Sequence, residues 1–122
     1  MAEPTPIAIA LTDDERFVLE RGLVEWAGPA RCTDALAVAM GFADVDDLFG
    51  RTGPLLDALR SGAMAAGDWR RVVLATEFVF ASDLVGAGHD WSATTGLSDE
   101  ATIAALRSVQ RKLPAAVRTA GA

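Results

Sequence analysis

The segment from Val72 to Val85 most constrains the fold, because it places apolar side chains on almost every side of a helix. Four polar residues interrupt it, namely Thr76, Glu77, Ser82 and Asp83. The uninterrupted apolar runs are therefore much shorter than the roughly 20 residues that a bilayer span needs. A helix that is apolar all round is buried on most sides. The sequence thus predicts an all-α, single-domain bundle of five or six helices around a buried central helix over about 68–85.

The chain length fits one domain, since 122 residues lie within the usual size range of a single core. A composition of 51% hydrophobic and 23% charged residues excludes disorder and is typical of globular proteins. We expect an extended arm over 1–11, a helical domain over 12–113 and a flexible tail over 114–122. The chain has 24 alanines, and 10 arginines against one lysine, a composition that is typical of GC-rich bacterial genomes.

The charge balance excludes several classes of partner. Eleven basic and 17 acidic residues give 11 − 17 = −6, which disfavours nucleic-acid coating and anionic membranes. An acidic surface instead favours association with a protein that has a basic surface. The first residues lack a basic region and include Glu3, so we expect a cytoplasmic protein. Cys32 is the lone cysteine, which excludes an internal disulfide and a multi-cysteine zinc site, and we expect no cofactor or metal.

Capping signals mark the first and last helices. Thr12 and Glu15 form a capping box that opens a helix running to Gly28–Pro29. Its expected apolar stripe consists of Phe17, Leu19, Leu23, Val24 and Trp26. Ser98 caps the final helix, which we expect to end at Pro114. Its expected inward residues are Ile103, Leu106, Val109 and Leu113.

Glycines divide the middle of the chain into short expected elements. A helix over 35–40 ends at Gly41, and a further turn runs from Asp44 through Phe49. Gly50 and Gly53 are expected to break the chain before a helix that ends near Gly62. Residues 64–67 read as a linker. The arm alternates apolar residues but has no candidate partner strand, so we expect it to lie across the helices.

Residues 35–49 resemble a helix-turn-helix, with a small alanine in the first helix and Gly41 at the turn. In the DNA-binding form of that motif, the second helix enters the major groove. Here that helix would present Asp44, Asp46 and Asp47, whose carboxylates would repel phosphates. We therefore expect the packing of a helix-turn-helix without DNA binding. The three aspartates become candidate contacts to a protein partner.

Residues 86–97 form the longest expected connection and contain the triplet His89-Asp90-Trp91. Histidine titrates near neutral pH, and tryptophan is a frequent anchor in protein interfaces. The triplet is therefore a candidate contact to a partner or ligand. The alternative is that Trp91 plugs the end of the bundle while its neighbours are solvated. Glu77 and Asp83 are expected as buried polar residues, and an arginine such as Arg70, Arg107 or Arg111 is the expected partner.

These patterns favour a small acidic protein–protein interaction module, acting as an adaptor, inhibitor or immunity-type regulator without catalytic activity. The alternative is a ligand-binding protein or enzyme with a pocket between the central helix and residues 86–97. A third hypothesis is a transcription-related protein with a helix-turn-helix. A homodimer built on the first helix and the arm is also open. No motif identifies a family.

Overall fold

The structure is a computed structural model that describes residues 5–28 and 30–121. Expectations that fall on residues 1–4, on Pro29 and on Ala122 lie outside the described residues. The elements in chain order are β1 (Ile7–Ala8), α1 (Asp13–Val24), the 3-10 helix η1 (Glu25–Ala27), α2 (Asp34–Ala39), α3 (Val45–Ser61), β2 (Ala63–Met64), α4 (Ala66–Ala81), α5 (Trp91–Thr95) and α6 (Asp99–Gly121). The described residues thus contain six α-helices and one two-stranded sheet, which confirms the all-α prediction.

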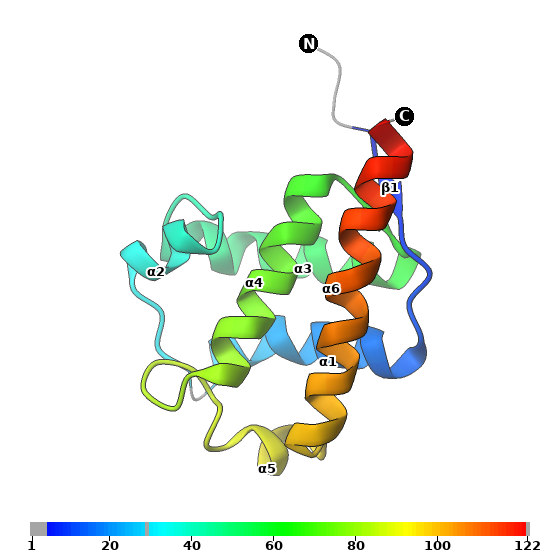
Figure 1. The fold of residues 1–122 in the computed structure, drawn as a ribbon. Coiled ribbons are helices and arrows are strands. Elements are labelled where there is room, and N and C mark those ends of the chain that lie inside the picture. Colours follow the sequence, from blue (N-terminus) through cyan, green and yellow to red (C-terminus); the bar gives the residue numbers. More distant parts are fainter. Residues whose placement is uncertain (1–4, 29, 122) are drawn as a thin grey trace.

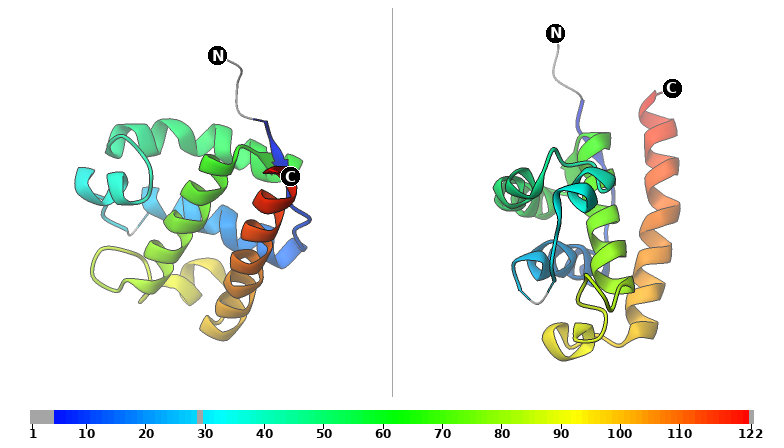
Figure 2. Two further views of the ribbon diagram at one scale, coloured as in Figure 1. Left: turned by 45° about the horizontal axis from the view of Figure 1, so that its top comes forward. Right: turned by 90° about the vertical axis from the view of Figure 1, so that its left-hand side faces the viewer.

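Helix α4 holds the central position that the sequence predicts for its apolar segment. Figure 1 shows α4 beside α6, running in the opposite direction, with α1 and α3 behind them. In the side view of Figure 2, α4 lies between α6 on one flank and α1, α2 and α3 on the other. The helix ends at Ala81 rather than near Val85. None of the described helices combines the length and apolar character that crossing a membrane requires.

The buried core is anchored by three tryptophans whose indole N–H groups all donate hydrogen bonds. Trp26 donates to the carbonyl of Ala75 at 3.1 Å and Trp69 to that of Ile7 at 2.8 Å. Trp91 donates to the Thr102 hydroxyl at 2.8 Å. A buried polar group without a partner costs free energy, so these bonds allow large aromatic side chains to fill the core.

The first helix begins as predicted. Thr12 accepts from the backbone N–H of Glu15 at 3.1 Å, and the Glu15 carboxylate accepts from the N–H of Thr12 at 2.7 Å. The expected apolar stripe is wrong at Phe17, which is 41% exposed, whereas Val18 is buried in its place. Helix α1 crosses α4 at Gly22, which lies directly against Thr76.

Two further predictions, a break inside α3 and the end of α6, are wrong. Gly50 and Gly53 do not break the chain, because α3 is one helix from Val45 to Ser61. Its buried residues Leu48, Leu55 and Leu59 share one face across the glycines. Pro114 does not end α6, which continues to Gly121. The expected helix ends at Gly41 and Gly62 are confirmed, and both glycines have a positive φ, of 100° and 79°.

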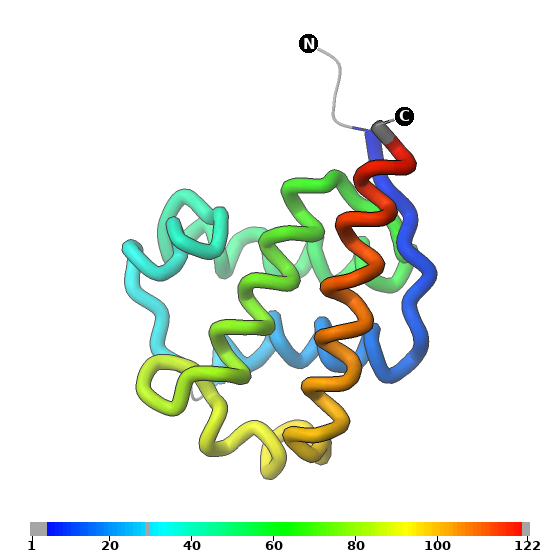
Figure 3. The backbone as a smooth tube through the Cα atoms, in the orientation of Figure 1, coloured from blue at the N-terminus to red at the C-terminus, as the bar shows by residue number. Residues whose placement is uncertain are grey.

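The arm has a partner strand, contrary to the prediction that it would only lie across the helices. Ile7 pairs with Met64 and Ala8 with Ala63 in an antiparallel register. The N–H of Ile9 also donates to the carbonyl of Gly62 at 3.0 Å. Figure 3 shows the described start of the chain running beside the last turns of α6.

The connection after α4 is compact. The N–H of Ala87 donates to the carbonyl of Val79 at 2.7 Å, which folds the loop back on the end of the helix. A Cβ at Gly86 would lie 2.5 Å from that same carbonyl, so glycine is required there. Helix α5 follows and leads into α6.

Candidate functional site

One stripe of α4 is exposed although the helix is central. Spacings of three and four residues place Arg70, Leu74, Phe78 and Ala81 along this stripe, with Glu77 beside it. Arg70, Phe78 and Ala81 are exposed, and Phe78 retains 36% of its accessible surface. An apolar stripe that no neighbour covers is therefore left on a helix whose other sides are buried.

Helix α6 borders this stripe with a mixed surface of its own. Ile103 is 48% exposed, so the prediction that it faces the core is wrong. Arg107 and Arg111 follow at intervals of four residues and are exposed. We call the combined surface the α4–α6 face. It comprises Arg70, Leu74, Glu77, Phe78 and Ala81 of α4 with Ile103, Arg107, Gln110, Arg111 and Pro114 of α6.

Glu77 lines three hollows, of which the first lies against α4 alone and the second and third follow the line between the two helices. The first, of about 280 Å³, lies at Phe78, Ala81 and Ser82. The second, of about 270 Å³, reaches Ile103 and Arg107, and the third, of about 200 Å³, extends from Arg70 to Pro114. The α4–α6 face is therefore a shallow groove with a largely apolar lining.

A chain of hydrogen bonds crosses the floor of the groove. Gln110 donates from Nε2 to Glu77 Oε2 at 2.8 Å and accepts at Oε1 from Arg107 at 2.9 Å. The single carboxylate of the face is thus held by a neutral amide. The expected arginine partner of Glu77 is replaced by Gln110, and Glu77 is half-buried rather than fully buried.

The arginines of the face are not neutralised by neighbouring acids. Within residues 5–28 and 30–121, the ion pairs of the chain involve other cations, and Arg70, Arg107 and Arg111 contact no carboxylate within 4.0 Å. The face is therefore locally basic on a chain whose net charge is −6. This local excess of positive charge is the main electrostatic feature of the groove.

The structure places the His89-Asp90-Trp91 triplet partly inside the molecule. Trp91 is completely buried, and its ring packs edge-on against Phe80 with 5.4 Å between centroids. A side chain with no exposed surface cannot contact a partner in this conformation, so Trp91 is a core residue. His89 and Asp90 are exposed beside it.

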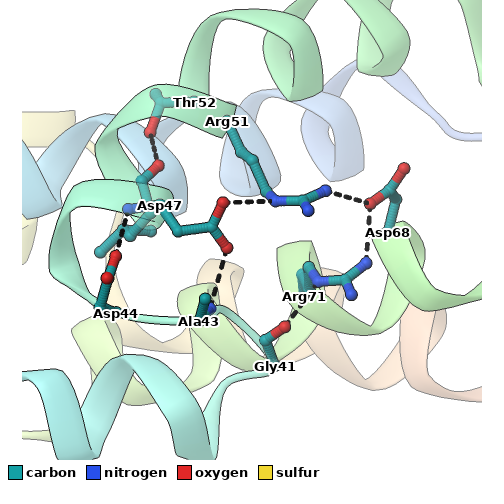
Figure 4. A network of polar contacts seen from close by, with 9 residues as sticks. Gly41, Ala43, Asp44, Asp47, Arg51, Thr52, Asp68 and Arg71 are labelled. Carbon is teal, nitrogen blue, oxygen red and sulfur yellow. Dashed lines mark hydrogen bonds and ion pairs between the residues drawn. The ribbon is translucent and has the colours of Figure 1, made fainter.

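Asp47 has a structural role at the start of α3. Its carboxylate accepts from the N–H of Ala43 at 2.9 Å and from Arg51 at 2.9 Å, as Figure 4 shows. The hydrogen bond from Ala43, together with Arg51, lowers the pKa of Asp47.

Asp68 and Arg71 extend this network into α4. Arg51 lies 3.9 Å from Asp68, which pairs with Arg71 at 2.9 Å, and Arg71 donates to the carbonyl of Gly41 at 2.7 Å. The network therefore ties the turn before α3 to the start of α4. Asp44 caps α3 by accepting from the N–H of Asp47 at 2.7 Å, and Asp46 is exposed.

The buried acids differ from those that the sequence singles out. Asp83 is exposed because α4 ends before it. Glu15 and Glu25 are each 2% exposed, and they bind Lys112 at 2.6 Å and Arg21, respectively. Glu25 lies four residues after Arg21, a spacing that indicates a pair, whereas nothing local connects Glu15 with Lys112.

The surroundings of Cys32 disfavour its ionised form. Cys32 is partly buried, and its pKa is raised by burial and by the nearby Asp34. A higher pKa lowers the fraction of reactive thiolate at neutral pH. Among the described residues, no group of three or more His, Cys, Asp or Glu side chains is arranged to hold a metal ion.

The exposure of these residues on one common face was not predicted, because their sequence pattern has two interpretations. Arg107 and Arg111 near the expected end of a helix fit the helix dipole equally well. Phe78 in an apolar run is typical of core. The usable signal was the four-residue interval from Ile103 through Arg107 to Arg111, which places all three on one side of α6.

Comparisons of the chain with protein-family models, with curated proteins and with solved structures found no match.

Proposed function

We propose that this chain is a protein–protein interaction module that docks a partner on its α4–α6 face. In this role it would act as an adaptor, inhibitor or immunity-type regulator, in the bacterial cytoplasm. The observation that carries the proposal is the exposure of Phe78 and Ile103 on adjacent helices, 36% and 48% respectively, in two hollows that Glu77 and Ala81 both line. Exposed apolar patches of this kind, rimmed by polar residues, are typical of protein interaction sites.

The composition of the groove supports a protein partner. Aromatic residues and arginine are enriched at the centres of protein interfaces, and both occur here at Phe78, Arg70 and Arg107. The hollows are shallow and extended along the helices, which suits a polypeptide better than an enclosed small molecule.

The competing hypotheses receive less support. The ligand pocket was expected between the central helix and residues 86–97, but the three hollows that Glu77 lines include no residue of that segment. In the region that resembles a helix-turn-helix, Asp46 is exposed at the start of α3, where a phosphate contact would be repulsive. The expectation of a basic partner rests on the net charge, whereas the local charge of the groove governs what docks there.

The test is capture of a partner from a lysate of the source organism with matched bait variants. Ala81 and Ala39 are both exposed and each is the last residue of its helix, so Ala81→Glu and Ala39→Glu make the same chemical change. Ala81 lines the hollows around Phe78 and Ile103, whereas Ala39 lines a different hollow between α2 and the start of α4, which Arg70 and Leu74 also border. Circular dichroism and thermal unfolding first establish that both variants fold.

We expect the wild type and the Ala39→Glu variant to retain one protein at near-stoichiometric level. The Ala81→Glu variant should retain about tenfold less, because a charge in the apolar lining must be desolvated on docking. Equal retention by both variants, or no protein retained by the wild type, would refute docking on this face.

A further inference from the structure

We propose that the segment that occupies the α4–α6 groove is an acidic amphipathic helix of the partner protein. This inference rests on the proposed function and adds the shape and charge of the docked segment. Two features of the groove lead to it, the absence of backbone groups that could pair with an extended strand and the two arginines that line it.

The walls of the groove favour a helix over an extended peptide. Both walls are helices, so an extended peptide would find no free strand edge to pair with. A helix satisfies its own backbone and can pack its side chains between those of α4 and α6. The hollows extend from Ile103 to Pro114 of α6, which at 1.5 Å per residue is about 16 Å, or three turns of a partner helix.

The charges that line the groove specify an acidic occupant. Arg70 shares a hollow with Pro114, and Arg107 lies seven residues earlier on α6, about 10 Å or two helical turns away. Among the residues that the structure describes, neither arginine lies within 4.0 Å of a carboxylate, while Glu77 is already hydrogen-bonded to Gln110. A docked helix with two carboxylates about two turns apart would pair with both arginines and leave Glu77 undisturbed.

A second copy of the chain fits this face less well. A twofold dimer brings the same surface of both copies together. It would therefore set the arginines of one copy against those of the other, which is unfavourable for like charges at an interface. In a head-to-tail contact, exposed Phe17 and its acidic neighbours would enter the groove of another copy. The oligomeric state of the pure protein tests this arrangement.

The experiment selects helical peptides on the full chain from a display library. The peptides have about 14 residues, or about four turns, and each position varies among alanine, leucine, glutamate, lysine and glutamine. The binding targets are the wild type, the double variant Arg70→Glu/Arg107→Glu and the matched control Arg31→Glu/Arg60→Glu. Both doubles replace two exposed arginines, so they change the net charge equally.

We expect the wild type and the control to enrich amphipathic peptides with glutamates about seven positions apart. The groove variant should bind those peptides at least tenfold more weakly in fluorescence anisotropy. Enrichment of basic or neutral peptides, no enrichment, or equal binding to the groove variant would overturn the inference. Sedimentation of the pure wild type as a dimer that Arg70→Glu/Arg107→Glu dissociates would also overturn it, in favour of a second copy.

The outcomes separate this inference from the proposed function. If no acidic peptide is selected while Ala81→Glu still loses the captured protein, docking on the face stands and the acidic helix is wrong. If Ala81→Glu keeps the protein, both are wrong.

Discussion

Glu15 has two structural roles, because it caps α1 and its ion pair with Lys112 joins α1 to α6. Burial raises the pKa of its carboxyl, but hydrogen bonds from Lys112 and the Thr12 N–H, with the charge of Lys112, lower it overall to about 2. The ordinary value for this group is 4.5. Since the folded state has the lower pKa, the ionised carboxylate stabilises the fold above about pH 4.5, and this contribution is lost as the pH falls towards 2.

This pKa predicts how the variant Glu15→Gln depends on pH. A shift from 4.5 to about 2 corresponds to about 3 kcal/mol in the free energy of unfolding. At pH 7 the wild type should therefore be more stable than Glu15→Gln by about 1–3 kcal/mol. Urea unfolding followed by tryptophan fluorescence at pH 7, 4.5 and 3 measures the gap, which should narrow steadily below pH 4.5. A gap that stays constant across this range would contradict the role given to the Glu15 charge.

At the scale of elements, the crossing of α1 and α4 depends on the absence of a side chain at Gly22. A Cβ there would lie 2.0 Å from the Thr76 hydroxyl oxygen and 2.8 Å from the Thr76 Cα, so part of the conflict is with backbone. Gly53 provides the contrast, because it lies within α3 with nothing inside 4 Å of an added Cβ. Alanine substitutions at the two positions therefore test two effects separately, close packing at Gly22 and helix propensity at Gly53.

We predict opposite effects for the two alanine substitutions. Gly22→Ala should lower the free energy of unfolding by about 1–3 kcal/mol, as overpacking of a buried contact does. Gly53→Ala should raise it by about 0.5–1 kcal/mol, because alanine favours the helix and meets no obstacle. Chemical denaturation of both variants at pH 7 tests this. A Gly22→Ala protein as stable as the wild type would show that the helices do not cross this closely.

The elements also show which parts of the fold are predictable from sequence. The α1 capping box is local, so Thr12 and Glu15 sufficed to place it. The α3 break was a wrong prediction because glycine propensity costs only about 1 kcal/mol per residue, and three buried leucines on one face outweigh it. The helix continues past Pro114 because Leu113 and Ala116 pack against the core. The β1–β2 pair was not predicted because its two-residue strands are too short to carry a periodic signal.

The candidate site was less predictable than the fold for a physical reason. Hydrophobic periodicity distinguishes apolar from polar faces but does not separate a buried apolar face from an exposed one. Phe78 and Val79 are adjacent and equally apolar, yet Val79 is completely buried and Phe78 is not. The difference lies in which sides of α4 its neighbours cover, and Val79 lies one turn after Thr76, on the side that packs against α1.

At the scale of the whole molecule, charge is distributed unevenly. The exposed acids include Asp13 and Asp14 of α1 and Asp46 of α3, whereas the α4–α6 face presents arginines around an apolar groove. The net charge of −6 of the whole chain thus comes from residues outside this face. An acidic partner would be attracted to the face and repelled elsewhere, which favours one docking orientation.

The central claim, that the α4–α6 face is the docking surface, is tested most directly by site-specific photocrosslinking. Benzoylphenylalanine replaces either Phe78 in the groove or Phe49 on α3, two aromatic residues with comparable exposure of 36% and 47%. Irradiation in a lysate of the source organism is followed by mass spectrometry of the adducts. The proposal predicts one defined adduct from position 78 and none from position 49. An adduct from position 49 alone would contradict it.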